Sequence, residues 1–244
     1  MGNEQIDVDI LAELKAFSDQ NVINIYLPSQ KKTVKFKKLN VKQQKSLLLV
    51  ALDDAKSLVN FNIALYDIIN ENIVDGKDLD INIYDRNSII FNLLKEDAPA
   101  DKVEIYTKIC NNYANVDVEI EDSVINNKII QFTLSVPTLQ RDYTYNKKLL
   151  TKYNSDIENK KEFIDHTYLI EIAKYVSKIE IDKGGKQKII TTLHNEKLDS
   201  IFKIVDSLPS VNHIINYMSR VKQLETKLNT VGKETIDISP SLFI

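Results

Sequence analysis

The sequence is short of the residues that build phosphate-binding loops, disulfides and membrane spans. Its 244 residues include five glycines, five prolines, one cysteine and no tryptophan. So few glycines leave little material for loops that cradle phosphates, and the sequence carries no Walker A, GxGxxG, GxSxG or EF-hand pattern. One cysteine cannot form an internal disulfide, which fits a reducing compartment. No apolar run approaches the roughly 18–20 residues that a membrane-spanning helix requires, so we expect no membrane partner.

A strong excess of one charge is missing as well. The formal net charge is −3 with 27% charged residues, and both signs are mixed along the chain. Nucleic-acid binders usually show a basic balance or a strong basic stripe, so composition argues against nucleic acid as the main partner. Residues 1–21 carry scattered acids and no apolar segment, so we expect no signal peptide. The hydrophobic fraction of 43% is enough for a real core.

The residues that carry metal and nucleophilic chemistry are few and scattered. His166, His194 and His213 form no HxxxH or HExxH pair, so we expect no metal site and no cofactor. Cys110 lies in a stretch without an obvious base, and we interpret it as a small buried hydrophobe. Adjacent carboxylates such as Asp53-Asp54 have no sequence neighbour that would shift their pKa values. We therefore predict that the protein is not an enzyme.

The stretch from Val22 to Leu52 predicts a strand, a turn, a strand and then a helix. Val22 to Leu27 is rich in strand-forming residues, and Pro28-Ser29-Gln30 is a turn signal. The second strand alternates apolar and basic residues. This alternation places Val34 and Phe36 on one face of the strand and Lys35 and Lys37 on the other. Asn40 with Gln43 three residues later predicts a capping box at a helix start. The simplest core is a hairpin whose apolar face lies on this helix.

We predict an α+β fold with an N-terminal β-hairpin packed on helices, a small antiparallel β middle and a helical C-terminal part. Composition and periodicity divide the chain into four regions: an N-terminal arm (1–20), a hairpin-plus-helices unit (21–100), a small antiparallel β region (101–145) and a mainly helical C-terminal region (146–244). The acidic arm has two open interpretations, a loosely docked segment and a segment that orders on a partner.

Several elements are predicted within these regions. Asn60-Phe61-Asn62 indicates a break between two helices, and Asp85 is the expected cap of a helix over 86–95. Alternation predicts strands over 103–110, 116–120 and 129–136. The later elements predicted are a helix over 168–178, two short strands around Gly184-Gly185, and helices over 196–207 and 211–230.

A lysine cluster is the most visible charge feature, and its core members are Lys31, Lys32, Lys35, Lys37 and Lys38. One interpretation is a solvated hairpin face whose lysines discourage pairing between strands of different molecules. A second is a docking surface for an acidic protein partner. A third is a nucleic-acid contact, which the absence of arginines and stacking aromatics disfavours.

The C-terminal part offers an apolar helix stripe and an apolar chain end. The stripe includes Ile214, Met218 and Val221, spaced by threes and fours, and the end includes Leu242 and Phe243. Both features have two interpretations, packing in the protein's own core and insertion into a partner's groove. We carry these five residues forward as candidate partner contacts together with the lysine cluster.

The hairpin region resembles the N-terminal region of the baseplate hub assembly proteins of T4-like tailed phages. The resemblance rests on Leu27-Pro28-Ser29, the Val34 and Phe36 strand, and the Leu39-to-Lys45 stretch that opens the helix; it is looser around Asp85-Arg86. It implies a non-catalytic, chaperone-like assembly factor that binds a hub or tail-tip protein. It also implies a location in the host cell cytoplasm or the virion baseplate.

Two alternatives remain beside this expectation. The first is a structural baseplate subunit that stays in the virion. The second is a regulator that binds nucleic acid through the lysine cluster, for which salt-dependent binding to random DNA would be diagnostic.

Overall fold

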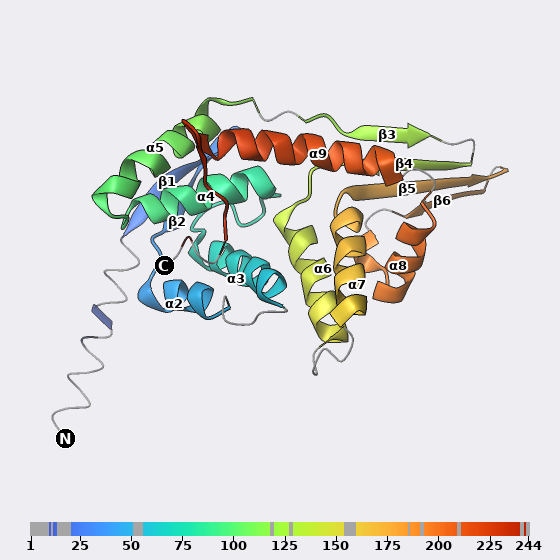
Figure 1. Ribbon diagram of the computed structural model, residues 1–244, viewed down its shortest axis with the longest axis horizontal. Helices are drawn as coiled ribbons and strands as arrows, with labels where there is room; N and C mark the ends of the chain where they lie inside the picture. The colour runs from blue at the N-terminus through green and yellow to red at the C-terminus, as the bar shows by residue number, and fades with distance from the viewer. Residues whose placement is uncertain are drawn as a thin grey trace, which may run out of the picture.

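The chain folds as an α+β protein in the computed structural model (Figure 1), which confirms the predicted class. The residues described are 10, 12–13, 21–50, 56–117, 120–126, 129–153, 160–184, 186–190, 193–208, 211–239 and 242. The helices are α2 (Val41–Leu49), α3 (Ser57–Asn72), α4 (Ile83–Lys95), α5 (Ala100–Asn115), α6 (Leu139–Lys152), α7 (Lys160–Ala173), α8 (Leu198–Asp206) and α9 (Val211–Leu228), with a short 3-10 turn, η2 (Leu193–Asn195). The strands are β1 (Val22–Leu27), β2 (Lys32–Lys37), β3 (Ser123–Asn126), β4 (Ile130–Leu134), β5 (Val176–Lys183), β6 (Lys186–Ile190), β7 (Thr230–Val231) and β8 (Glu234–Thr235).

The predicted N-terminal hairpin and its helix cap are confirmed. β1 and β2 pair antiparallel, with Ile25 opposite Val34, and both side chains are buried. Lys35 lies on the exposed face, as alternation predicts. At the start of α2, the Asn40 side chain accepts from the Gln43 N–H at 2.9 Å, and the Gln43 side chain accepts from the Asn40 N–H at 3.2 Å. This is the predicted capping box.

The hairpin packs mainly on α4, so the prediction that it rests on α2 is wrong. β1 runs along α4, which buries Ile89, Ile90 and Leu93. α2 has nine residues and buries two of them, Gln43 and Leu47, of which Leu47 shares the hairpin's core. The longer apolar face of α4 buries more area and therefore outcompetes the helix that is nearest in sequence.

The outer edge of β2 is closed by the segment after α3. Phe36 forms a β-bridge with Ile73, and the Val74 N–H donates to the Lys35 carbonyl at 2.9 Å. The Lys35 N–H donates to Asp75 Oδ1 at 2.6 Å. Because the backbone groups of this edge are occupied there, β2 is protected from pairing with another chain, and the hairpin is fixed to the body.

The helices after α2 differ from the predictions in their starts and continuity. α3 runs unbroken through the Asn60-to-Asn62 stretch because Phe61 between the two asparagines is buried in the core, so the predicted break is wrong. α4 begins at Ile83 and is capped by Asn82 instead of Asp85. Asp85 occupies the third helical position and completes a second capping box with the Asn82 N–H.

The middle of the chain contains an antiparallel β3-β4 pair between two helices, so the predicted β region over 101–145 is right for its centre and wrong at both ends. The predicted strand over 103–110 lies inside α5, whose buried side chains recur at a helical period: Tyr106, Ile109, Cys110 and Tyr113. Within 116–120, the described residues 116, 117 and 120 are not in a strand. β4 does confirm the prediction over 129–136, but it pairs with β5 from the next region in a four-stranded antiparallel sheet ordered β3-β4-β5-β6. The sheet therefore crosses the expected boundary at residue 145.

The last third follows the predictions more closely. α7 ends at Ala173 and β5 begins at Val176, so the second half of the helix predicted over 168–178 is wrong. The β5-β6 hairpin, α8 and α9 confirm their predictions to within a few residues. α9 ends before a tight β7-β8 turn, where Gly232 has a φ of 65° that favours glycine.

Two apolar cores share a wall made of α3 and α4. The hairpin, α2 and one face of these helices enclose the smaller core. The other face joins α5, the four-stranded sheet and α6 to α9 in the larger one. Figure 1 shows α9 spanning the molecule, from the sheet at its N-terminal end to α4 and α5 at its C-terminal end. This bridging helix positions the candidate site.

Candidate binding groove

A polar cluster holds the C-terminal half of α9 against α4 and α5. The Asn87 amide donates to Glu225 Oε1 at 2.8 Å and to the Tyr113 hydroxyl at 3.1 Å. Tyr113 donates to Asn229 Oδ1 at 2.6 Å, and Arg86 forms an ion pair with Glu225 at 3.4 Å. We call these five residues the polar clamp. All except Arg86 are buried, so every hydrogen bond replaces lost hydration.

The clamp stabilises an ionised Glu225. Burial works to raise the pKa of this carboxyl, but Arg86, the Asn87 hydrogen bond and Lys222 outweigh burial and hold the pKa below its usual value. Lys222 lies 3.0 Å from the second carboxylate oxygen. Because both oxygens are engaged by donors, Glu225 is suited to anchoring the helix and poorly suited to accepting a substrate proton.

A second polar contact fastens the hairpin turn to α4. Asp85 accepts hydrogen bonds from the Ser29 N–H at 2.9 Å, from the Ser29 hydroxyl and from the Asn82 N–H at 3.1 Å. Burial raises the pKa of Asp85, and these hydrogen bonds only partly oppose it. The Ser29 turn and the Asp85-Arg86 pair, which both contribute to the sequence resemblance, therefore meet in space.

A buried lysine joins the ends of α6 and α7. Lys174 is 3% exposed, and its Nζ lies 2.5 Å from Asp142 Oδ1 and also pairs with Glu171. Burial works to lower the pKa of Lys174, but the two carboxylates outweigh it and raise the pKa. A nucleophilic lysine must be neutral, so this charged amine has a structural role.

A groove of about 590 Å³ opens among α3, α7 and α9. Members of both buried ion-pair clusters line it, including Arg86, Glu225, Glu171 and Lys174. Pockets of roughly 300–1,000 Å³ are typical of ligand sites, so the size is sufficient for a sizeable group. We call this feature the α9 groove.

Exposed apolar side chains from three helices face the α9 groove. Leu58 of α3 is 58% exposed, Tyr168 of α7 is 53% exposed and Ile215 of α9 is 37% exposed. Met218, a predicted partner contact, is half-buried in the same lining. Single exposed apolar residues are ordinary, but several gathered around one concave surface mark an interaction site.

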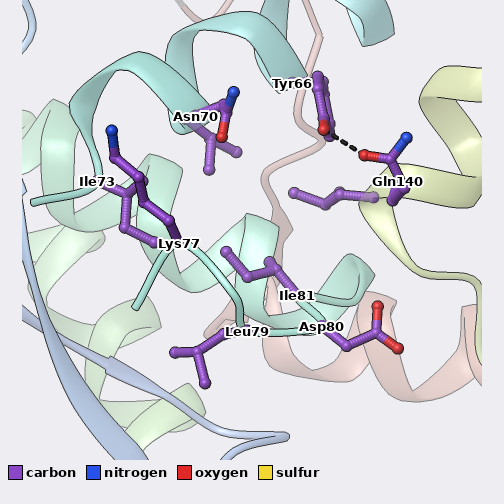
Figure 2. Close-up of a pocket in the computed structure, with 10 residues that line it drawn as sticks. Tyr66, Asn70, Ile73, Lys77, Leu79, Asp80, Ile81 and Gln140 are labelled. Atoms are coloured by element: carbon purple, nitrogen blue, oxygen red, sulfur yellow. Dashed lines mark hydrogen bonds between the residues drawn. The ribbon is translucent and has the colours of Figure 1, made fainter. Parts of the chain in front are cut away.

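A smaller cavity lies at the junction of α3, α6 and the loop over 77–81. Figure 2 shows Tyr66 and Gln140 reaching towards each other across it, and the Tyr66 hydroxyl donates to Gln140 Oε1. The Tyr66 ring also stacks on Tyr143, with 4.1 Å between ring centroids. The cavity holds about 90 Å³, which suits a few water molecules and is well below the size of a metabolite site.

The lysine cluster lies on the hairpin as predicted, but its members differ in availability. Lys31 pairs with Asp117 at 3.2 Å, and Lys38 pairs with Glu96 at 2.9 Å. Lys32 and Lys35 are exposed on β2, and Lys37 is half-buried. The hydrogen bond with Glu96 is the main cause of the raised pKa of Lys38, and it outweighs the opposite effect of partial burial.

The C-terminal candidates divide between core and surface. Ile214 and Val221 are 2% and 0% exposed, so the structure corrects their assignment as partner contacts and places them in the core. Met218 remains partly accessible in the α9 groove. Leu242 packs against both apolar cores, and Phe243 lies outside the described residues.

Cys110 and the histidines lie on separate elements. Burial raises the pKa of the Cys110 thiol to about 11, so little nucleophilic thiolate forms at neutral pH. His166 contacts the Tyr153 hydroxyl and stacks on Phe202, with ring centroids 3.9 Å apart. Burial lowers the pKa values of His166 and His194. Within the described part of the chain, no group of three His, Cys, Asp or Glu residues is arranged to hold a metal ion.

Comparisons with known proteins provide no relatives. The chain matches no protein-family model, no curated protein and no solved structure. Across the described helices, none is both long and apolar enough to cross a membrane.

The polar clamp is the part of the site that sequence reasoning missed. Asn87, Tyr113 and Glu225 are far apart in the chain, and each resembles an ordinary polar residue on a helix surface. The one available signal was that Glu225 follows Val221 by four residues and therefore shares the buried face of α9.

Proposed function

We propose that this protein is a non-catalytic assembly factor for the baseplate hub of a contractile-tailed phage. It binds a hub or tail-tip subunit in the host cell cytoplasm, covers the aggregation-prone surface of that subunit and helps to bring the subunit into the baseplate. The resemblance of the Val22-to-Leu52 stretch to the T4-like family is the observation that carries this proposal.

Exposed lysines on a firmly held hairpin support a binding role. Lys35 lies on the outer face of β2, and Lys32 is exposed where the strand leaves the turn. The edge of β2 is closed, and the turn is fastened by Asp85. A rigid surface loses little conformational entropy when it binds. Lysines on such a surface favour an acidic partner, because charge complementarity speeds association and selects the partner.

The decisive experiment is co-expression with the neighbouring tail genes, followed by affinity purification of this protein. We expect a hub or tail-tip subunit to be retained by the wild-type chain. The double variant Lys32→Glu/Lys35→Glu should retain it on the order of tenfold less at low salt, because both changes reverse exposed positive charges on the proposed hairpin surface. Lys227→Glu/Lys233→Glu, which makes the same charge change at exposed sites elsewhere, is the matched control.

Three outcomes would contradict the proposal in different ways. Retention of no hub component by the wild type would remove the assembly role. Stoichiometric presence of the chain in purified virions, measured by mass spectrometry, would favour a structural subunit. Salt-sensitive binding to random DNA that the lysine changes abolish would favour the nucleic-acid alternative.

A further inference from the structure

We propose that the α9 groove is the docking site for one amphipathic helix of a partner protein, with its apolar face inward and lysine or arginine at its margin. The inference rests on the proposed function only in taking another protein as the partner. It concerns a surface separate from the lysine face, so the two can fail independently.

The exposed apolar side chains in the groove call for an apolar face on its occupant. Leu58, Tyr168 and Ile215 present exposed side chains from three different helices to one concave surface. Covering them removes apolar area from water, which is the main favourable contribution to such association. Met218 adds an unbranched, adaptable side chain that fits differently shaped partners.

The backbone around the groove favours a helix over an extended segment. Most of the lining residues lie inside α3, α4, α7 and α9, where the backbone N–H and C=O groups already bond within the helix. The groove therefore offers few backbone partners to an extended peptide, which would have to bury its own polar groups unpaired. A helix satisfies its backbone internally and can enter such a groove without that cost.

The charges around the groove favour basic residues on the occupant. Four carboxylates and three cations line it. Arg86 and Lys174 have side chains that are 15% and 4% exposed and are neutralised within ion pairs, so they offer little to an incoming anion. Asp237 is exposed at the groove, and Glu171 pairs with Lys174 but its side chain remains 42% exposed, so these two acids are placed to meet lysine or arginine. Lys222 is the accessible base, and Glu225 already engages it.

Synthetic helices provide a direct test. The probe is a fluorescein-labelled peptide about four turns long, with leucines at i, i+3, i+4 and i+7 and lysines flanking them. The comparison peptides replace the lysines by glutamates or scramble the order of the same residues. We expect saturable binding of the lysine peptide to the full chain in fluorescence anisotropy, several-fold weaker binding of the glutamate peptide and no saturation with the scrambled one.

Variants locate the binding site. Ile215→Glu and Leu58→Glu each place a charge in the groove at an exposed position and should weaken binding by on the order of tenfold. Val41→Glu is the matched control, because Val41 is 79% exposed and does not line the groove. Unchanged thermal unfolding of each variant establishes that the fold is intact.

Four results would overturn the inference. They are absent binding, equal binding of the scrambled peptide, binding that Ile215→Glu leaves unchanged, and a wild-type dimer that Ile215→Glu dissociates, which would assign the groove to a second copy. Any of these four results, obtained together with hub retention that depends on Lys35, would refute the groove and leave the proposed function standing. Groove-dependent peptide binding without hub retention would support the groove and refute the proposed function.

Discussion

The two ends of α9 are secured by opposite kinds of interaction. Its first three turns bury Ile214, Tyr217 and Val221 in the larger apolar core. Its last turns bury Glu225 beside the apolar Leu228, and Asn229 follows directly after the helix; Glu225 and Asn229 have polar partners from α4 and α5. Apolar packing is strong but non-directional, whereas hydrogen bonds require particular atoms at particular angles. The difference indicates that the apolar end supplies attachment, while the polar end selects one rotation of the helix and so shapes the α9 groove.

Replacing Glu225 by leucine should lower the free energy of unfolding most, because it removes the buried acceptor of the polar end of α9. The change leaves Arg86 and the Asn87 amide without their acceptor, and breaking a buried ion pair from one side costs about 3–5 kcal/mol. Urea unfolding followed by circular dichroism measures the loss. The double variant Arg86→Leu/Glu225→Leu removes both charges and should recover part of it. Strictly additive losses would contradict the coupling between these two side chains.

Truncating the apolar end should cost somewhat less. Ile214→Ala removes a side chain that is 2% exposed and should lower the free energy of unfolding by about 2–5 kcal/mol through lost burial and a residual cavity. The adjacent Ile215 is 37% exposed, so Ile215→Ala should cost less than about 1 kcal/mol in the same assay. Equal losses at the two positions would contradict the assigned orientation of α9.

Acid should affect the two buried carboxylates in opposite directions. The folded pKa of Glu225 lies below its ordinary value of 4.5, so the stability it contributes is present above that value and is lost as pH falls through the folded pKa. The folded pKa of Asp85 lies above its ordinary value of 3.8. Its contribution is therefore present below that value and is lost as pH rises through the folded pKa.

Unfolding free energies of Glu225→Gln and Asp85→Asn, measured from about pH 3 to about pH 7, test this difference. The wild-type advantage over Glu225→Gln should shrink towards acid, and the advantage over Asp85→Asn should grow. Parallel pH curves for the wild type and both variants would show that neither carboxylate has the environment described.

The smallest of these effects is expected at the hairpin turn. Ser29→Ala removes one hydroxyl donor from Asp85, which keeps backbone donors from Ser29 and Asn82. The expected loss is about 1 kcal/mol, the usual net value of one hydrogen bond. Lys35→Glu, on the exposed face of the same hairpin, should change stability by less than about 0.5 kcal/mol and serves as the control. If Ser29→Ala lowered the free energy of unfolding as much as Glu225→Leu does, the Ser29 hydroxyl would not be a contact that other donors partly replace.

Local patterns predicted the hairpin and its cap because neighbours in sequence produce them. Alternation along β2 and the Asn40-to-Gln43 spacing involve residues at most a few positions apart. The strand predicted over 103–110 is wrong because Val103 and Ile105 alternate like a strand, whereas the buried set from Tyr106 to Tyr113 follows the helical period of α5. Both periods can be present in one short segment, and the partner surface decides between them.

Among the candidate contacts, burial was the property that sequence could not assign. Ile214, Met218 and Val221 belong to one apolar stripe, yet Met218 lines the groove while the other two enter the core. Neighbouring positions on a helix differ by about 100° in direction, and only the surrounding elements determine which direction meets solvent.

Local sequence patterns are enough to predict the α+β class, the N-terminal hairpin, the start of α2 and the late helices, because each depends on contacts within a few residues. Three contacts depend on the folded molecule as a whole: β1 packs on α4, β4 pairs with β5, and Glu225 bonds with Asn87 across 138 positions of chain. These contacts form between segments whose separate patterns are compatible with several partners. The choice among those partners depends on the total area buried and the polar groups satisfied in the whole molecule.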